Sequence, residues 1–71
     1  MKEQPLTILR LGGVISRTGL SRSTIYQRIS EGRFPKSISL EGRCVGWIES
    51  EITEWLHERV DASRGGYQVE N

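Results

Sequence analysis

The stretch Thr18-Gly19-Leu20-Ser21-Arg22-Ser23-Thr24-Ile25-Tyr26 places a glycine turn directly before the start of a helix. Ser21 can cap that helix, because its hydroxyl can accept a bond from a free backbone amide of the first turn. Leu20 before the cap and Ile25 at the fourth helical position have the spacing of a hydrophobic staple. The pattern predicts a helix over residues 22–31, which ends where the next glycine supplies a left-handed stop.

This helix has two different faces. On a helical wheel Ile25 and Ile29 share one apolar side, and the opposite side carries Ser23, Gln27 and Ser30. The opposite side is small and polar, and it lacks the Glu/Lys pairs that a merely solvated helix face usually carries. We expect the apolar side to pack in the core and the polar side to face a binding partner.

The residues before this helix predict a short strand and a first helix. Residues 7–11 are rich in branched apolar side chains, which favours a strand or an extended entry. Residues 12–17 carry Val14 and Ile15 at helical spacing, and Gly19 stands where a C-terminal glycine belongs. Two short helices joined by a glycine turn are typical of a helix-turn-helix, whose second helix enters the DNA major groove.

The second half of the chain predicts a hairpin and a third helix. Residues 37–40 alternate polar and apolar side chains as a half-buried strand does, and residues 44–48 return as its partner. Gly42 lies between them and can adopt the positive φ of a tight turn. Residues 49–60 have helical spacing. The apolar stripe of this helix consists of Ile52, Trp55, Leu56 and Val60.

The length of 71 residues allows one small domain, and an apolar content of 35% allows only a thin core. We expect a mainly α fold with a small β-hairpin, arranged as a winged helix-turn-helix domain over residues 6–61. Residues 1–5 are predicted to form a flexible N-terminus, and residues 62–71 a disordered tail.

Composition argues against membrane, metal and enzyme chemistry. The longest apolar runs have two residues, against the roughly 20 of a membrane helix, and no apolar stretch follows the N-terminus as in a secretory signal. Cys44 and His57 are each the single residue of their type, so we expect no disulfide, no metal site and a cytoplasmic location. No nucleophile–base pair and no phosphate-binding glycine loop occurs, so we predict neither a catalytic site nor a cofactor.

Charge is divided unevenly along the chain, although the formal net charge is only +1. Residues 10–43 contain seven basic residues against two acidic ones, whereas residues 44–71 contain two basic residues against six acidic ones. Exposed charges more than about 8 Å apart are largely screened at physiological salt, so the local field decides where a polyanion docks. The first half of the chain is therefore the expected DNA-binding part.

Candidate base-reading residues lie at the start and on the polar side of helix 22–31. Arg22 suits bidentate bonding to guanine and Gln27 suits adenine, with Ser23 as a further candidate reader. Tyr26 can donate its hydroxyl to a phosphate while its ring rests on the core. The alternative for Arg22, Ser23 and Gln27 is an idle solvated surface, and for Tyr26 it is packing alone.

Three further basic residues are candidate contacts to the DNA backbone, through the helix or through the wing. They are Arg28, Lys36 and Arg43. Each cation that engages a phosphate should add nearly one unit to the slope of log affinity against log salt. For Arg43 the alternative is a turn residue that only keeps the hairpin soluble.

Several different short motifs follow one another along the chain at characteristic distances. They are Leu9-Arg10-Leu11, residues 14–26, Glu31-Gly32-Arg33-Phe34-Pro35-Lys36, Gly42-Arg43, Gly46-Trp47-Ile48-Glu49-Ser50-Glu51-Ile52 and Trp55-Leu56. As a set they resemble the AlpA family of prophage regulators over about residues 6–60. One departure is Gly12-Gly13, where that family more often has charged helix formers. Members of the family resemble MerR-type winged helix-turn-helix domains and phage excisionases.

The resemblance implies a DNA-binding regulator of prophage or mobile-element genes that acts on double-stranded DNA in the bacterial cytoplasm, at the nucleoid. It also implies an alternative, an excisionase that directs site-specific recombination, so the protein partner is an RNA polymerase or an integrase. A third possibility is an interaction adaptor that uses the acidic third helix. The sequence leaves open whether the chain acts as a monomer or assembles on DNA.

Overall fold

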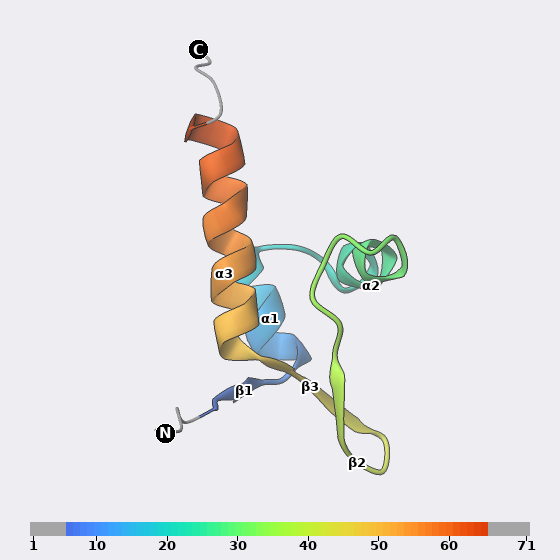
Figure 1. The fold of residues 1–71 in the computed structure, drawn as a ribbon. Coiled ribbons are helices and arrows are strands. Elements are labelled where there is room, and N and C mark those ends of the chain that lie inside the picture. The colour runs from blue at the N-terminus through green and yellow to red at the C-terminus, as the bar shows by residue number, and fades with distance from the viewer. Residues whose placement is uncertain (1–5, 66–71) are drawn as a thin grey trace.

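The computed structural model describes residues 6–65, so the expectations for residues 1–5 and 66–71 lie outside the described part of the chain. Within residues 6–65 the chain forms the helices α1, α2 and α3 and a small sheet (Figure 1), which confirms the mainly helical fold with a hairpin. The elements in chain order are β1 (Ile8–Leu9), α1 (Leu11–Thr18), α2 (Arg22–Ser30), β2 (Ile38–Glu41), β3 (Cys44–Ile48), α3 (Glu49–Val60) and the π-helical turn η1 (Asp61–Gly65).

The first strand is shorter than the sequence predicts, and the first helix begins earlier. Arg10 is the N-cap of α1, with φ −87° and ψ 173°, and its carbonyl accepts the first helical bond from the Val14 amide at 3.0 Å. Leu11 therefore starts the helix and cannot belong to the strand. The predicted glycine stop is confirmed, because Gly19 has φ 76° and its amide bonds to the Ile15 carbonyl at 2.8 Å.

The sheet has three antiparallel strands in the order β1-β3-β2, so β3 is central. Leu9 pairs with Trp47, and Ile38 pairs with Gly46. The expectation of a half-buried β2 is wrong, because Ile38 is 37% and Leu40 41% exposed. The helices α1 and α3 contact β3, whereas β2 forms the edge of the sheet and projects beyond them (Figure 1).

The core gathers one buried side chain from each major part of the chain. Its members are Val14, Ile25, Phe34, Trp47 and Ile52. Three of them lie on the three helices, one on the central strand and one on the segment that follows α2. This small cluster therefore joins the three helices to the central strand, as expected for a chain of this length.

The third helix buries less of its stripe than the sequence predicts. Ile52 is fully buried, and Trp55 and Leu56 pack against the core from the side. Val60 is 45% exposed, because the C-terminal half of α3 extends past the other elements (Figure 1). The chain continues helically into η1, four residues beyond the predicted domain end at residue 61. No helix in residues 6–65 is long and apolar enough to cross a membrane.

Candidate nucleic-acid interface

The cap of α2 forms as its sequence predicts. The Ser21 hydroxyl accepts a bond from the Thr24 amide at 3.2 Å and donates to the Thr24 hydroxyl at 2.9 Å. Gly32 has φ 74° and lies just past the helix end. Ile25 is fully buried, which sets the rotation of the helix about its axis. The N-terminus of α2 and the side opposite Ile25 are therefore presented to solvent.

The predicted base-reading residues occupy that outward surface. Arg22, Ser23 and Gln27 are all exposed. Within the described chain Arg22 forms no ion pair. Neither α3 nor the hairpin covers this side of α2, which lies at one edge of the molecule in Figure 1. The polar face of α2 is therefore uncovered, as a helix that faces DNA requires.

Gln27 takes part in a surface network that sequence reasoning missed. Its side-chain amide donates to Glu31 at 3.3 Å, and the same carboxylate accepts a bond from Arg33 at 3.1 Å. The spacing of four residues between Gln27 and Glu31 is the signal that could have revealed it. All three side chains are exposed, so the network is weak and Gln27 can exchange this bond for one to a base.

Tyr26 connects α2 to the hairpin. Its ring meets Trp47 edge-on, with centroids 6.3 Å apart and an interplanar angle of 62°, and the residue is 41% exposed. The indole N–H of Trp47 donates to the Pro35 carbonyl at 3.1 Å. The helix α2, the central strand and the segment before β2 thus meet at one buried tryptophan, which couples their positions.

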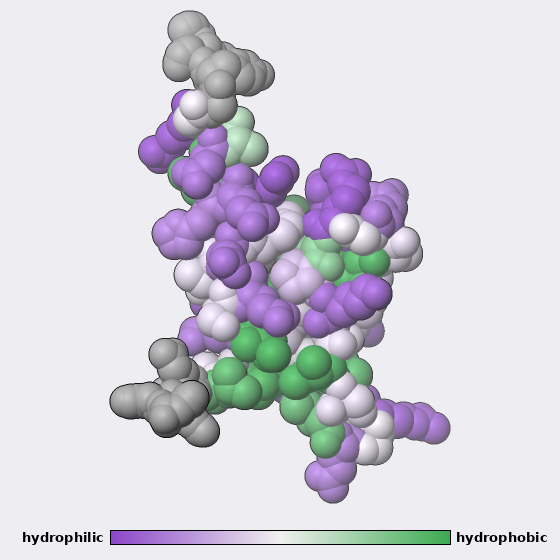
Figure 2. All heavy atoms as spheres, in the orientation of Figure 1, coloured by the Kyte–Doolittle hydropathy of each residue, from purple (hydrophilic) through white to green (hydrophobic). Residues whose placement is uncertain are grey.

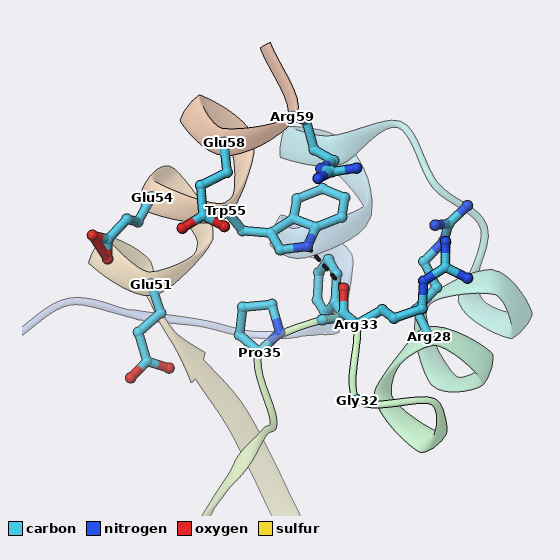
Figure 3. Close-up of a pocket in the computed structure, with 10 residues that line it drawn as sticks. Arg28, Gly32, Arg33, Pro35, Glu51, Glu54, Trp55, Glu58 and Arg59 are labelled. Carbon is cyan, nitrogen blue, oxygen red and sulfur yellow. Dashed lines mark hydrogen bonds between the residues drawn. The ribbon is translucent and has the colours of Figure 1, made fainter. Parts of the chain in front are cut away.

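Arg28 lies on a different side of α2 from Ser23 and Gln27. It is half-buried, and Figure 3 shows it lining a groove between α2 and α3. Its Nε is buried and has no hydrogen-bond partner in the described part of the chain. Among the predicted contact residues, Arg28 is therefore the one that the fold separates from the others.

The hairpin carries its two predicted cations at opposite ends. Arg43 is exposed in the turn between β2 and β3, where Gly42 has φ 56°, and Lys36 is exposed just before β2. The hairpin projects away from the helices in Figure 1. The Arg10 side chain donates to the Val45 carbonyl of β3 at 2.9 Å, a contact between distant parts of the sequence that local patterns do not predict.

Ion pairs within residues 6–65 neutralise few of the basic side chains. Arg17 on α1 lies 3.4 Å from Glu49 and also donates to Thr53 at 2.9 Å, which ties α1 to α3. The other pair is the one between Arg33 and Glu31. The cations of α2 and the hairpin form no ion pair within these residues, so they are available to a polyanion.

In Figure 2 hydrophilic residues cover α2 and α3, and hydrophobic residues gather over the sheet.

A capped helix with an exposed polar side, preceded by a second helix and followed by a β-hairpin, defines a winged helix-turn-helix protein. Residues 7–60 match the family described as Prophage CP4-57 regulatory protein (AlpA), and the chain belongs to that family. This confirms the resemblance that the sequence motifs carry. The family is described as one of regulatory proteins.

Two relatives support this assignment. The chain is 46% identical over 61 residues to the uncharacterized protein ORF88 of Enterobacteria phage P4, covering 86% of this chain and 69% of that one. It is 47% identical over 58 residues to the DNA-binding transcriptional activator AlpA of Escherichia coli K12, covering 73% of this chain and 83% of the relative.

Proposed function

We propose that this protein is a sequence-specific DNA-binding regulator of prophage or mobile-element genes, with α2 in the major groove and the β2–β3 hairpin as a wing. The observation that carries the proposal is the exposed polar side of α2, held beside a hairpin whose tip bears an unpaired Arg43. Its relative in Escherichia coli is described as a DNA-binding transcriptional activator. Such a regulator acts in the bacterial cytoplasm, at the nucleoid.

The proposed contacts divide into reading and positioning. Arg22 and Gln27 read base edges, and each well-formed pair is worth about 1–3 kcal/mol of discrimination against a wrong base. Ser23 is a further reader between them. Tyr26 donates its hydroxyl to a phosphate, from a ring already fixed against Trp47.

The remaining cations contact the DNA backbone. Arg43 reaches it from the wing tip and Lys36 from the wing base. Arg28 is a peripheral phosphate contact, since its half-buried side chain lies at the flank of α2. These contacts carry no sequence information of their own, but each should contribute nearly one unit to the salt dependence.

The test is a binding titration, by gel shift or fluorescence anisotropy, against DNA from the chromosomal neighbourhood of the protein's own gene and against scrambled duplex. We expect Arg22→Ala to weaken binding to the specific DNA by roughly tenfold to a hundredfold and to leave binding to scrambled DNA almost unchanged. Arg64→Ala is the matched control, because Arg64 is an exposed arginine in η1, at the far end of the chain's helical part. Equal affinity of the wild type for both DNAs would refute sequence specificity.

Two alternatives from the sequence give different results in the same experiments. An excisionase would use the same α2 and wing surface, but it would bend its DNA, bind several sites cooperatively and contact an integrase. Bending the DNA costs of order 1–6 kcal/mol, which extra contacts must offset. A circular-permutation gel detects such a bend, so it distinguishes an excisionase from a regulator that leaves the DNA straight. An adaptor would retain its activity in the Arg22→Ala variant and lose it when the acidic residues of α3 are reversed.

A further inference from the structure

An open groove of about 600 Å³ lies between α3 and the segment that follows α2 (Figure 3). Its floor is apolar and consists of Phe34, Pro35 and Trp55. The Phe34 and Trp55 rings meet edge-on with centroids 4.7 Å apart, and the indole N–H of Trp55 donates to the Arg33 carbonyl at 2.9 Å. The floor is therefore held in place by the core, with Pro35 and Trp55 partly exposed and Phe34 almost fully buried.

One wall of the groove is acidic. Glu51, Glu54 and Glu58 are three and four residues apart on α3, so they lie on one side of the helix, and all three are exposed. None of them forms an ion pair within residues 6–65. Like charges at this spacing repel one another along a helix. The negative charge of this wall is therefore available to a cationic partner.

The opposite wall is basic. Arg33 is exposed, and its guanidinium pairs weakly with Glu31 at the surface; the Arg28 Nε beside it has no hydrogen-bond partner in residues 6–65. Arg59 lies at the upper end of the groove, with its guanidinium 5.7 Å from the centre of the Trp55 ring. No ion pair joins the two walls in the described part of the chain, so each wall remains available to a partner.

We propose that this groove is a self-association surface, which takes the same groove of a second copy of the chain. A two-fold interface brings each surface patch against its own copy. If the two-fold axis runs along the groove, the acidic wall of each copy faces the basic wall of the other, and the apolar floors meet between them. A two-fold axis across the groove would instead oppose like charges.

A partner of a single charge fits the groove less well. DNA would be attracted to Arg28 and Arg33 but repelled by Glu51, Glu54 and Glu58 on the other wall. A basic peptide would be attracted to the three glutamates but repelled by Arg28 and Arg33. Only a partner that carries both signs, separated by an apolar strip, satisfies both walls, and the chain itself is such a partner. The inference goes beyond DNA recognition and does not depend on it.

The groove is small, so the association should be weak and salt-sensitive. Interfaces at the small end of the known range are typical of transient complexes. Exposed ion pairs weaken as the Debye length falls from about 10 Å at 0.1 M salt to about 3 Å at 1 M. We therefore expect a monomer–dimer equilibrium in the upper micromolar range at low salt, shifted toward monomer by salt.

Sedimentation equilibrium of the full chain, from ten micromolar to one millimolar at low salt, tests the proposal. We expect Glu54→Lys and Arg33→Glu each to lower the association constant by about tenfold or more, because each puts like charges on facing walls in both halves of the dimer. An equimolar mixture of the two variants should recover association to within about threefold of the wild type, since the mixed dimer has opposite charges at both contacts. The double variant should recover it in the same way.

Arg64→Glu is the matched charge reversal outside the groove and should leave association unchanged. A wild type that stays monomeric to one millimolar would overturn the proposal, and so would single variants that associate as well as the wild type or a mixture that fails to recover. Thermal unfolding of each variant excludes misfolding as a cause. Binding of DNA at nanomolar protein, where the chain is monomeric, reports on the proposed function separately, so the two can fail independently.

Discussion

Gly46 is the position at which the smallest side-chain addition should disturb the molecule most. It lies at the middle of β3, opposite Ile38 of β2. A Cβ built on it would lie 2.5 Å from Ile8 Cγ2, 3.2 Å from Leu40 Cδ1 and 3.2 Å from the Leu9 carbonyl oxygen. The β-branched Ile8 has little rotamer freedom, and the Leu9 carbonyl is backbone, so β1 would have to move as a whole. Gly46→Ala therefore forces the two strands apart.

The size of the effect follows from these contacts. Inserting a methyl group into a packed site lowers stability by about 1–3 kcal/mol, and the two neighbours on β1 place Gly46→Ala near the middle of that range, at about 2 kcal/mol. For a domain of this size such a loss lowers Tm by roughly 8–16 °C. Because single domains have only roughly 0.05–0.15 kcal/mol of stability per residue, this is a large share of the total.

Chemical and thermal denaturation, followed by circular dichroism, measures this change against a matched control. Gly12→Ala adds the same methyl group, but its Cβ meets no atom within 4 Å, and alanine favours the α1 helix, so stability should be unchanged or rise by up to about 1 kcal/mol. Adding Ile8→Ala to Gly46→Ala should recover part of the loss, because it removes the atom that is crowded. A Gly46→Ala protein as stable as the wild type would refute the reasoning.

Three further outcomes follow. Ser21→Ala removes the cap bond to Thr24 and should lower stability by about 1 kcal/mol in urea denaturation, whereas Ser21→Asp should preserve it; equal loss in both would contradict a capping role. Trp55→Phe keeps an aromatic ring against Phe34 but removes the bond to the Arg33 carbonyl, so unfolding free energy should fall by about 1 kcal/mol, and no change would show that the bond is dispensable. Arg43→Ala should reduce the slope of log affinity against log salt by nearly one unit for specific and scrambled DNA alike, and an unchanged slope would remove Arg43 from the interface.

The local elements of the fold could be predicted because their signals are local. Ser21, Gly19 and Gly32 act through bonds and backbone angles within a few residues of themselves, and the structure has each of them in its expected conformation. The helix α2 differs from its predicted range by one residue at its C-terminal end. Caps and glycine stops specify helix ends independently of the rest of the chain.

Non-local features were not accessible from the same patterns. The pairing of β1 with β3 joins residues about forty positions apart, and alternation in β2 gave no sign that it would form an exposed edge. The bond from Arg10 to the Val45 carbonyl depends on that pairing. The groove is likewise invisible in the sequence, because its two walls come from the end of α2 and from α3 and meet only after packing.

The junction at Trp47 has a consequence for the length of DNA that the protein can recognise. Because this one indole touches Tyr26 and bonds the Pro35 carbonyl, it couples the position of α2 to that of the hairpin. Under the proposed function, a recognised site should therefore present its groove edges to α2 and its flanking phosphates to the hairpin at one fixed spacing. One base pair inserted between these two contact regions should therefore weaken binding, because it changes both their separation and their relative rotation about the DNA axis.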